Sequence, residues 1–175
     1  MKDKFIGWAK IIRLHFYPTT WIAYSLGAMA APKRAHKWNH KVSWVGYLVL
    51  FLIELSTILA NEFCDYGTDR LNKDAGPFTG GTKVLVEGKL GFVEVKAGIL
   101  ASLILALGFG YLLIRINEQV YSFSILLLII TGLFLGLGCA APPLKFSYRG
   151  LGEITVAITY SPYVILCGYI FQQGS

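Results

Sequence analysis

The chain has 175 residues, of which 55% are hydrophobic and only 15% are charged. Soluble domains carry about 25% charged residues, so this composition excludes an ordinary soluble domain and favours a protein that spans a lipid bilayer. The net charge of +6 would suit a nucleic-acid partner, but the basic residues follow the loops between apolar segments. We therefore expect the bilayer, and no nucleic acid, to be the partner of these residues.

Several apolar segments reach, or nearly reach, the roughly 18 to 20 residues that a membrane-spanning helix needs. In chain order we expect helices over about 11–31, from about 42 to the acidic stretch near 61, and over about 92–114, 120–139 and 153–171. The first segment follows a basic stretch but lacks a small-residue cleavage site, so it is interpreted as an uncleaved helix and not as a signal peptide. The predicted fold is an all-α polytopic membrane protein, a single membrane domain over 1–175 with about five transmembrane helices.

The basic residues predict the orientation. If the N-terminus is cytoplasmic, most lysines and arginines fall on the cytoplasmic side, at the N-terminus, in 70–96 and in 145–149. The positive-inside rule favours that orientation, although the basic loop over 33–41 opposes it. We expect an integral membrane protein whose N-terminus and two cytoplasmic loops share one side.

The most informative motif follows the second apolar segment. Asn61, Asp65 and Asp69 occupy positions i, i+4 and i+8, which stack on one face of a helix. Two carboxylates and an amide oxygen at the end of a membrane helix are costly unless a cation neutralises them, and Mg²⁺ shared with phosphate oxygens suits such a set. The motif predicts these three residues as Mg²⁺ ligands and catalytic residues for a diphosphate substrate.

Cationic side chains in the loops on the same side are candidates for holding the diphosphate. They are Arg70, Lys73, Lys83, Lys145 and Arg149, with Tyr148 as a further donor. Taken singly, each basic residue is explained equally well by anchoring at the membrane surface. The glycine-rich run over 76–83 is not a P-loop, because threonine precedes lysine and no strand leads into it.

Glu54 lies seven residues before Asn61 and projects from nearly the same helical face. An acid this deep in an apolar segment is a functional candidate, as a pocket residue or a hydrogen-bonding group for a second substrate. A protonated or helix-paired glutamate is the alternative interpretation.

With these motifs the chain resembles the UbiA superfamily of intramembrane aromatic prenyltransferases. The resemblance rests on Asn61-x3-Asp65-x3-Asp69, Arg70-Leu71-Asn72-Lys73, Pro142-Pro143-Leu144-Lys145, Tyr148-Arg149-Gly150-Leu151-Gly152-Glu153, and Arg13 with Pro18-Thr19-Thr20. It implies Mg²⁺-dependent transfer of a polyprenyl group from a prenyl diphosphate to an aromatic acceptor in quinone biosynthesis, with Arg13 among the substrate-binding residues. Residues 80–88 and 148–153 are more similar to the menaquinone-type branch, whose acceptor is 1,4-dihydroxy-2-naphthoate.

One departure from the family pattern affects the expected activity. Family members are longer and carry a second Asp-rich motif on a later helix, and no such motif follows Asp69 here. We therefore expect the chain to be the N-terminal part of such an enzyme, which needs the second half of the domain or a partner chain and is not active alone. The alternative function is a small membrane transporter or channel that uses Glu54 and the Asn61/Asp65/Asp69 stripe as a cation site, although transporters place ionisable groups near the midplane.

Overall fold

The computed structural model describes residues 2–31, 38–73, 81–117 and 121–173. Within these ranges the regular structure is helical throughout and contains no strand. In chain order the helices are α1 (Lys2–Ile12), α2 (Tyr17–Ala30), α3 (His40–Cys64), α4 (Tyr66–Leu71), α5 (Phe92–Ile116), α6 (Ser122–Ala140), η1 (Phe146–Arg149), α7 (Gly152–Ile158), η2 (Thr159–Tyr163) and α8 (Val164–Gln173). The predicted all-α class is confirmed.

Four helical segments of the described chain are long and apolar enough to cross a membrane, which confirms the polytopic membrane class. They are α3, α5, α6 and the continuous helix Gly152–Gln173, which consists of α7, η2 and α8. The last of these contains a π-helical turn at η2, where Pro162 lies inside the helix. Proline has no backbone N–H to donate, so a wider turn is the local solution.

The first predicted helix is broken in the structure. We expected one helix over about 11–31, but α1 ends at Ile12 and α2 begins at Tyr17. Arg13 has a φ of 52°, in the left-handed region that interrupts a right-handed helix. The 14 residues of α2 extend about 21 Å, less than the hydrocarbon thickness of about 30 Å. The first of the five expected spans is therefore a short helix.

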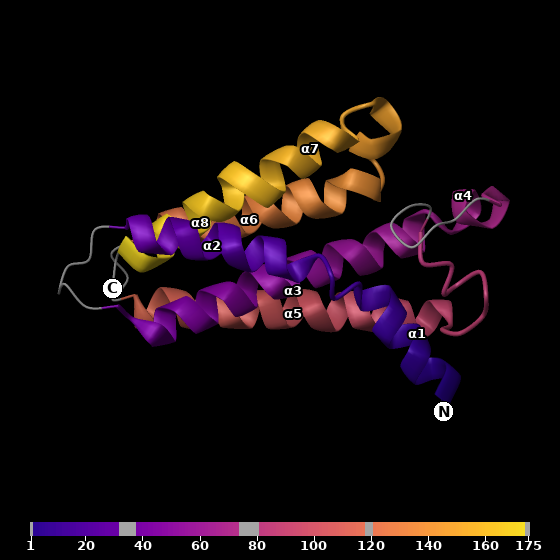
Figure 1. Ribbon diagram of the computed structural model, residues 1–175, viewed down its shortest axis with the longest axis horizontal. Coiled ribbons are helices and arrows are strands. Elements are labelled where there is room, and N and C mark those ends of the chain that lie inside the picture. The colour runs from indigo at the N-terminus through magenta and orange to yellow at the C-terminus, as the bar shows by residue number, and fades with distance from the viewer. Residues whose placement is uncertain (1, 32–37, 74–80, 118–120, 174–175) are drawn as a thin grey trace.

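The helices form two layers (Figure 1). In one layer α3 lies along α5, and in the other α2 lies along α8 beside α6. A buried apolar cluster from α3, α5, α6 and α8 fills the space between the layers, and includes Val49, Ile53, Ala106, Ile129 and Phe171.

The contact between α2 and α8 depends on glycine. A Cβ atom on Gly27 would lie 1.9 Å from the carbonyl oxygen of Ile165, and one on Gly168 would lie 2.1 Å from the carbonyl oxygen of Tyr24. The two backbones therefore touch, as small residues allow in membrane helix pairs.

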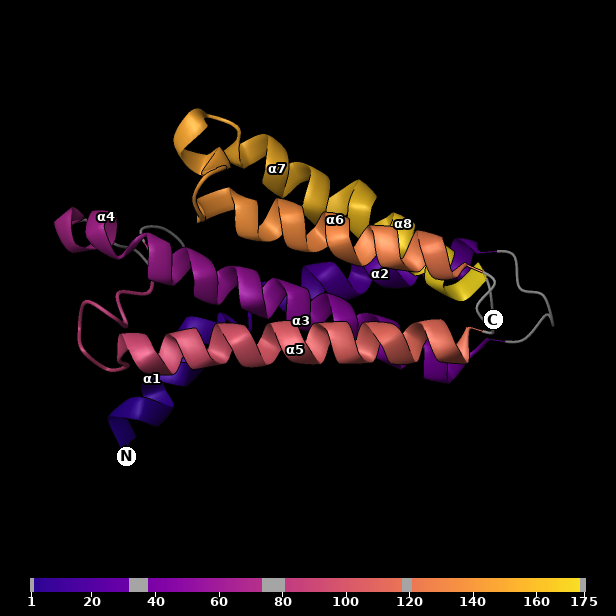
Figure 2. The ribbon, with the colours of Figure 1, turned by 180° about the vertical axis from the view of Figure 1, so that it is seen from behind.

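The segments that carry the predicted site gather at one end of the bundle. There α6 and α7 diverge from α3, and α4, α1 and the turn at η1 lie at the same end (Figure 2). The C-terminal end of α8 lies at the opposite end. This arrangement brings together the polar residues described next.

Candidate functional site

Asn61, Asp65 and Asp69 line one cavity at the α4 end of the bundle. The amide of Asp65 donates to the Asn61 carbonyl at 2.8 Å, and the amide of Asp69 donates to the Asp65 carbonyl at 2.8 Å. Helical hydrogen bonding therefore continues from α3 into α4 and keeps the three side chains on one face. The cavity has a volume of about 160 Å³ and is lined by Arg13, Ile58, Asn61, Glu62, Asp65, Asp69 and Gly81.

The charges around this cavity favour a cation. Three carboxylates and one guanidinium line it, and burial together with the Glu62 and Asp65 carboxylates raises the pKa of Asp69 to about 6. Within the described chain, the Oδ1 atom of Asn61 is buried and has no hydrogen-bond partner. Buried polar atoms nearly always have a partner, so an oxygen ligand is left open beside two acids.

The predicted metal ligands in this cavity, Asn61, Asp65 and Asp69, supply two carboxylates and one amide. Across the described residues no three His, Cys, Asp or Glu side chains form a group that could hold a metal ion. The amide of Asn61 with the carboxylates of Asp65 and Asp69 is instead a set that would suit Mg²⁺. This ion takes few protein ligands and completes its coordination with water or phosphate oxygens.

Tyr148 joins this site from η1. Its hydroxyl donates to Oδ1 of Asp65 at 2.6 Å, and this hydrogen bond raises the pKa of the phenol. The Lys145 ammonium lies 5.1 Å from the centre of the Tyr148 ring. Arg149 points elsewhere, because its Nη2 atom donates to the Pro143 carbonyl at 3.0 Å.

The other predicted cations lie at different distances from the cavity. Arg13 lines it, and Lys83 interacts electrostatically with Asp69 while its Nζ atom donates to the Asn72 carbonyl. Arg70 and Lys73 are exposed on and just after α4, and neither lines the cavity. The structure thus brings Arg13, Lys83 and Tyr148 to the acids, whereas Arg70 and Lys73 face solvent.

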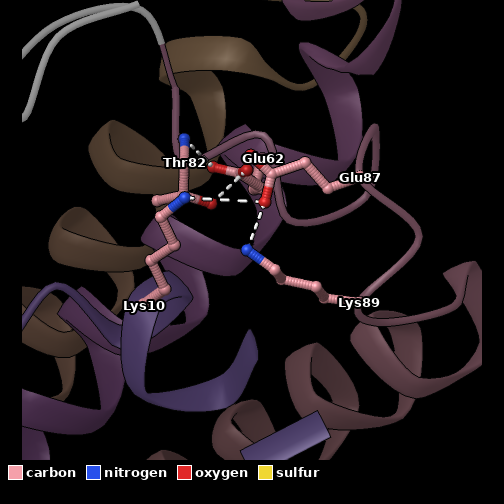
Figure 3. Close-up of polar contacts among 5 residues, drawn as sticks. All are labelled: Lys10, Glu62, Thr82, Glu87 and Lys89. Atoms are coloured by element: carbon pink, nitrogen blue, oxygen red, sulfur yellow. Dashed lines mark hydrogen bonds and ion pairs between the residues drawn. The ribbon is translucent and has the colours of Figure 1, made fainter. Parts of the chain in front are cut away.

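Glu62 is a site residue that the sequence analysis did not single out. Only 4% of it is exposed. Its carboxylate accepts hydrogen bonds from the Thr82 amide at 3.1 Å and from the Thr82 hydroxyl (Figure 3). It also accepts one from Arg13 Nη2 at 3.5 Å. These bonds tie residues 81–90, which we call the strap, to the end of α3. The sequence gives no signal for this contact, because Glu62 lies one position off the stripe and Thr82 lies twenty residues away.

The strap closes one side of the cavity. Gly81 has a φ of 74°, and a Cβ atom there would lie 2.1 Å from Oδ2 of Asp69, so only glycine lets the strap backbone approach this carboxylate. Farther along, Glu87 bridges Lys10 of α1 at 3.6 Å and Lys89 (Figure 3), and the hydrogen bond from Lys89 lowers the pKa of Glu87. The part of the glycine-rich run over 76–80 lies outside the described residues.

Two further cavities extend from the acidic one toward the interior. The middle cavity, of about 340 Å³, shares Arg13, Ile58 and Asn61 with the acidic cavity and is also lined by Phe16, Thr19, Thr57, Leu135, Gly136, Cys139, Thr155, Val156, Thr159 and Tyr160. The inner cavity, of about 70 Å³, shares Thr57, Gly136, Thr159 and Tyr160 with the middle one and is also lined by Thr20, Leu50, Ile53, Glu54, Gly132, Tyr163 and Val164. The three cavities therefore adjoin one another, with Asp69 in the lining of the acidic cavity and Glu54 in the lining of the inner one.

Glu54 lines the inner cavity and is also paired with two other helices. Its carboxylate accepts hydrogen bonds from the Thr20 hydroxyl of α2 at 2.8 Å and from the Tyr160 hydroxyl of η2 at 2.9 Å. Glu54 is therefore both a pocket residue and a glutamate paired with neighbouring helices, which are the two placements that the sequence left open.

No protein-family model matches this chain, and no curated protein and no solved structure is significantly similar to it. A functional proposal therefore depends on the site's geometry and on the sequence motifs.

Proposed function

We propose that this chain binds a prenyl diphosphate with Mg²⁺ and serves in transfer of the prenyl group to an aromatic acceptor, as in the UbiA superfamily that its motifs resemble. The observation that supports this best is the series of adjoining cavities, with acids and cationic donors at its outer end and mainly apolar walls deeper in. A prenyl diphosphate has the same division into a charged head and an apolar tail. The loop motifs favour 1,4-dihydroxy-2-naphthoate as the acceptor, the substrate of the menaquinone-type branch.

At the outer end, Asn61, Asp65 and Asp69 would hold the metal. The unpaired Oδ1 atom of Asn61 supports this assignment, because it is an oxygen donor without another use among the described residues. Bound Mg²⁺ offsets the negative charge of a diphosphate and makes it a better leaving group. Arg13, which lines the cavity, would donate hydrogen bonds to the phosphate oxygens beside that metal, and Tyr148 would orient the Asp65 carboxylate to which it donates.

Deeper in the bundle, the walls of the middle cavity would hold the reacting carbon away from water. Ile58, Leu135 and Val156 contribute apolar surface there. An allylic carbon that loses its diphosphate reacts readily with water, so excluding water directs it to the acceptor ring. A new carbon–carbon bond then replaces the carbon–oxygen bond to the diphosphate, and the ring passes one proton to the released diphosphate.

The first test measures binding and transfer separately in the full chain, reconstituted in lipid nanodiscs. We expect radiolabelled farnesyl diphosphate to bind with Mg²⁺ and to dissociate when EDTA removes the metal. Addition of 1,4-dihydroxy-2-naphthoate then tests for a prenylated product. Diphosphate binding that is equally tight with Mg²⁺ and with EDTA would contradict the proposal.

One observation favours the transporter as a second candidate. Glu54 lies within the apolar span α3 and lines the inner of three adjoining cavities, the outer of which is lined by the acids near the end of that span. Cation flux into liposomes, measured with an enclosed fluorescent indicator, distinguishes the two functions. Flux that Glu54→Gln abolishes, together with no binding of farnesyl diphosphate, would favour transport.

A further inference from the structure

A cluster of hydroxyl groups surrounds Glu54 at the inner end of the cavities. Thr20 and Tyr160 donate to the two oxygens of its carboxylate. The hydroxyl of Tyr17 is buried, interacts electrostatically with Glu54 and has no hydrogen-bond partner within the described chain. Three helical segments, α2, α3 and η2, therefore direct polar groups toward one point in the apolar interior.

This cluster has hydrogen-bonding capacity to spare. A carboxylate offers about four lone-pair sites, and the described donors to Glu54 are two neutral hydroxyls, with no ion pair to it. A carboxylate within a membrane span is costly when it is not fully satisfied, and so is a buried hydroxyl without a partner. Glu54 can accept one more hydrogen bond, and Tyr17 can still donate one.

Glu54 lines the inner cavity, and an uncharged group that can donate a hydrogen bond to it is a hydroxyl. An anionic group would be repelled by Glu54. The cluster also lies within reach of a ligand in the middle cavity, since Tyr160 lines both that cavity and the inner one. The middle cavity, of about 340 Å³, falls in the usual range for small-molecule sites, roughly 300 to 1,000 Å³.

We propose that Thr20, Glu54 and Tyr160 form a subsite for a phenolic hydroxyl of the aromatic acceptor. This inference rests on the proposed function for its choice of an aromatic ligand. With its hydroxyl at Glu54, the ring lies in the middle cavity, between this cluster and the acidic cavity that Arg13 and Asn61 also line. The subsite thus sets which edge of the ring faces the diphosphate end, and it selects a phenol over its methyl ether.

The test compares 1-naphthol with 1-methoxynaphthalene, which lacks only the hydroxyl proton donor. Binding of each to the chain in nanodiscs is measured by saturation-transfer NMR titration, with empty nanodiscs subtracted. We expect 1-naphthol to bind roughly tenfold more tightly than the ether, as for one hydrogen bond to a carboxylate. Glu54→Gln should reduce this preference to about twofold or less, whereas Tyr160→Phe, which frees a further acceptor site on Glu54, should keep or increase it.

Tyr163→Phe is the matched control, because Tyr163 also lines the inner cavity but its hydroxyl donates to the Leu128 carbonyl at 2.9 Å. It should leave the preference unchanged. An unchanged preference in Glu54→Gln, a lost preference in Tyr160→Phe, or no preference in the unmodified chain would overturn the proposal. Because Tyr160→Phe retains the bond from Thr20 to Glu54, it gives a result even if Glu54→Gln does not fold.

Farnesyl diphosphate binding is measured in the same samples. Its Mg²⁺ dependence tests the proposed function, whereas the preference for the phenol tests the subsite. Loss of one result with retention of the other therefore shows which of the two proposals fails.

Discussion

Four neighbouring polar side chains at the end of α3 have four different environments. Glu62 is bonded to Thr82 and Arg13, and Asp65 accepts from Tyr148. Asp69 lies against the backbone of Gly81, and Asn61 keeps an unpaired oxygen among the described contacts. Glu62 therefore contacts the strap and Arg13, and of the four only Asn61 has a side-chain oxygen that is buried without a partner among the described residues.

Asp65→Asn tests the metal role at this scale. The amide keeps the size of the side chain but removes one negative charge, so we expect Mg²⁺-dependent binding of farnesyl diphosphate to weaken at least roughly tenfold. Membrane insertion should be intact. Cys64→Ala is the adjacent control, since Cys64 does not line the acidic cavity, and undiminished binding in Asp65→Asn would remove Asp65 from the metal site.

Thr82→Val tests whether Glu62 holds the strap. Valine has nearly the same shape and keeps the backbone amide that donates to Glu62, but its side chain cannot donate to this carboxylate. Loss of a partner by a buried polar group costs about 1 to 3 kcal/mol. We expect faster hydrogen exchange of the strap amides, measured by mass spectrometry. Ser102→Ala is the control, because the described bond of the Ser102 hydroxyl goes to the Ile99 carbonyl within α5. In this variant the strap should exchange at the original rate. The original rate in Thr82→Val as well would show that the Thr82 hydroxyl bond to Glu62 does not hold the strap.

Single elements show where the sequence was sufficient and where it was not. The bounds of α5 and α6 are close to the predicted ones, because charged or polar residues flank an uninterrupted apolar run. The break between α1 and α2 was not predicted, because hydrophobic periodicity does not report that Arg13 adopts a positive φ. Likewise, nothing in the pattern shows that Gly27 and Gly168 bring two backbones into contact.

Gly168→Ala tests that contact between elements. Alanine favours a helix by about 1 kcal/mol over glycine, yet here its Cβ atom would lie 2.1 Å from the Tyr24 carbonyl oxygen, and overpacking costs about 1 to 3 kcal/mol. We expect a lower midpoint of thermal unfolding in detergent, followed by circular dichroism. Gly108→Ala on α5 is the matched control, because no atom would lie within 4 Å of a Cβ atom there. This variant should leave the midpoint unchanged or raise it. Equal effects of the two variants would exclude a close contact between α2 and α8.

In the whole molecule, chain direction explains why the distant motifs meet. The chain passes through the bundle in α3 and returns in α5, and α6 and α7 repeat this reversal, so α4, the strap and η1 lie at one end (Figures 1 and 2). The sequence predicted this convergence from the order of apolar and polar segments. It could not predict the contacts that depend on tertiary packing, such as Glu62 with Thr82 or Tyr160 with Glu54.

The last prediction concerns how the bundle crosses the membrane. The test places single cysteines at exposed positions in a chain from which Cys64, Cys139 and Cys167 have been removed. In vesicles of known orientation, an impermeant maleimide then reports on which side of the membrane each cysteine lies. Lys73→Cys and Arg149→Cys should react from one side, and Lys41→Cys and Arg115→Cys from the other, because α3 and α5 each have the length and hydropathy of a span. The positive-inside rule predicts that the first side is cytoplasmic, and under the proposed function a soluble prenyl diphosphate would reach the acids from there. If Lys73→Cys and Lys41→Cys reacted from the same side, α3 would not cross the bilayer, and the path from the acids to Glu54 would not lead into the membrane.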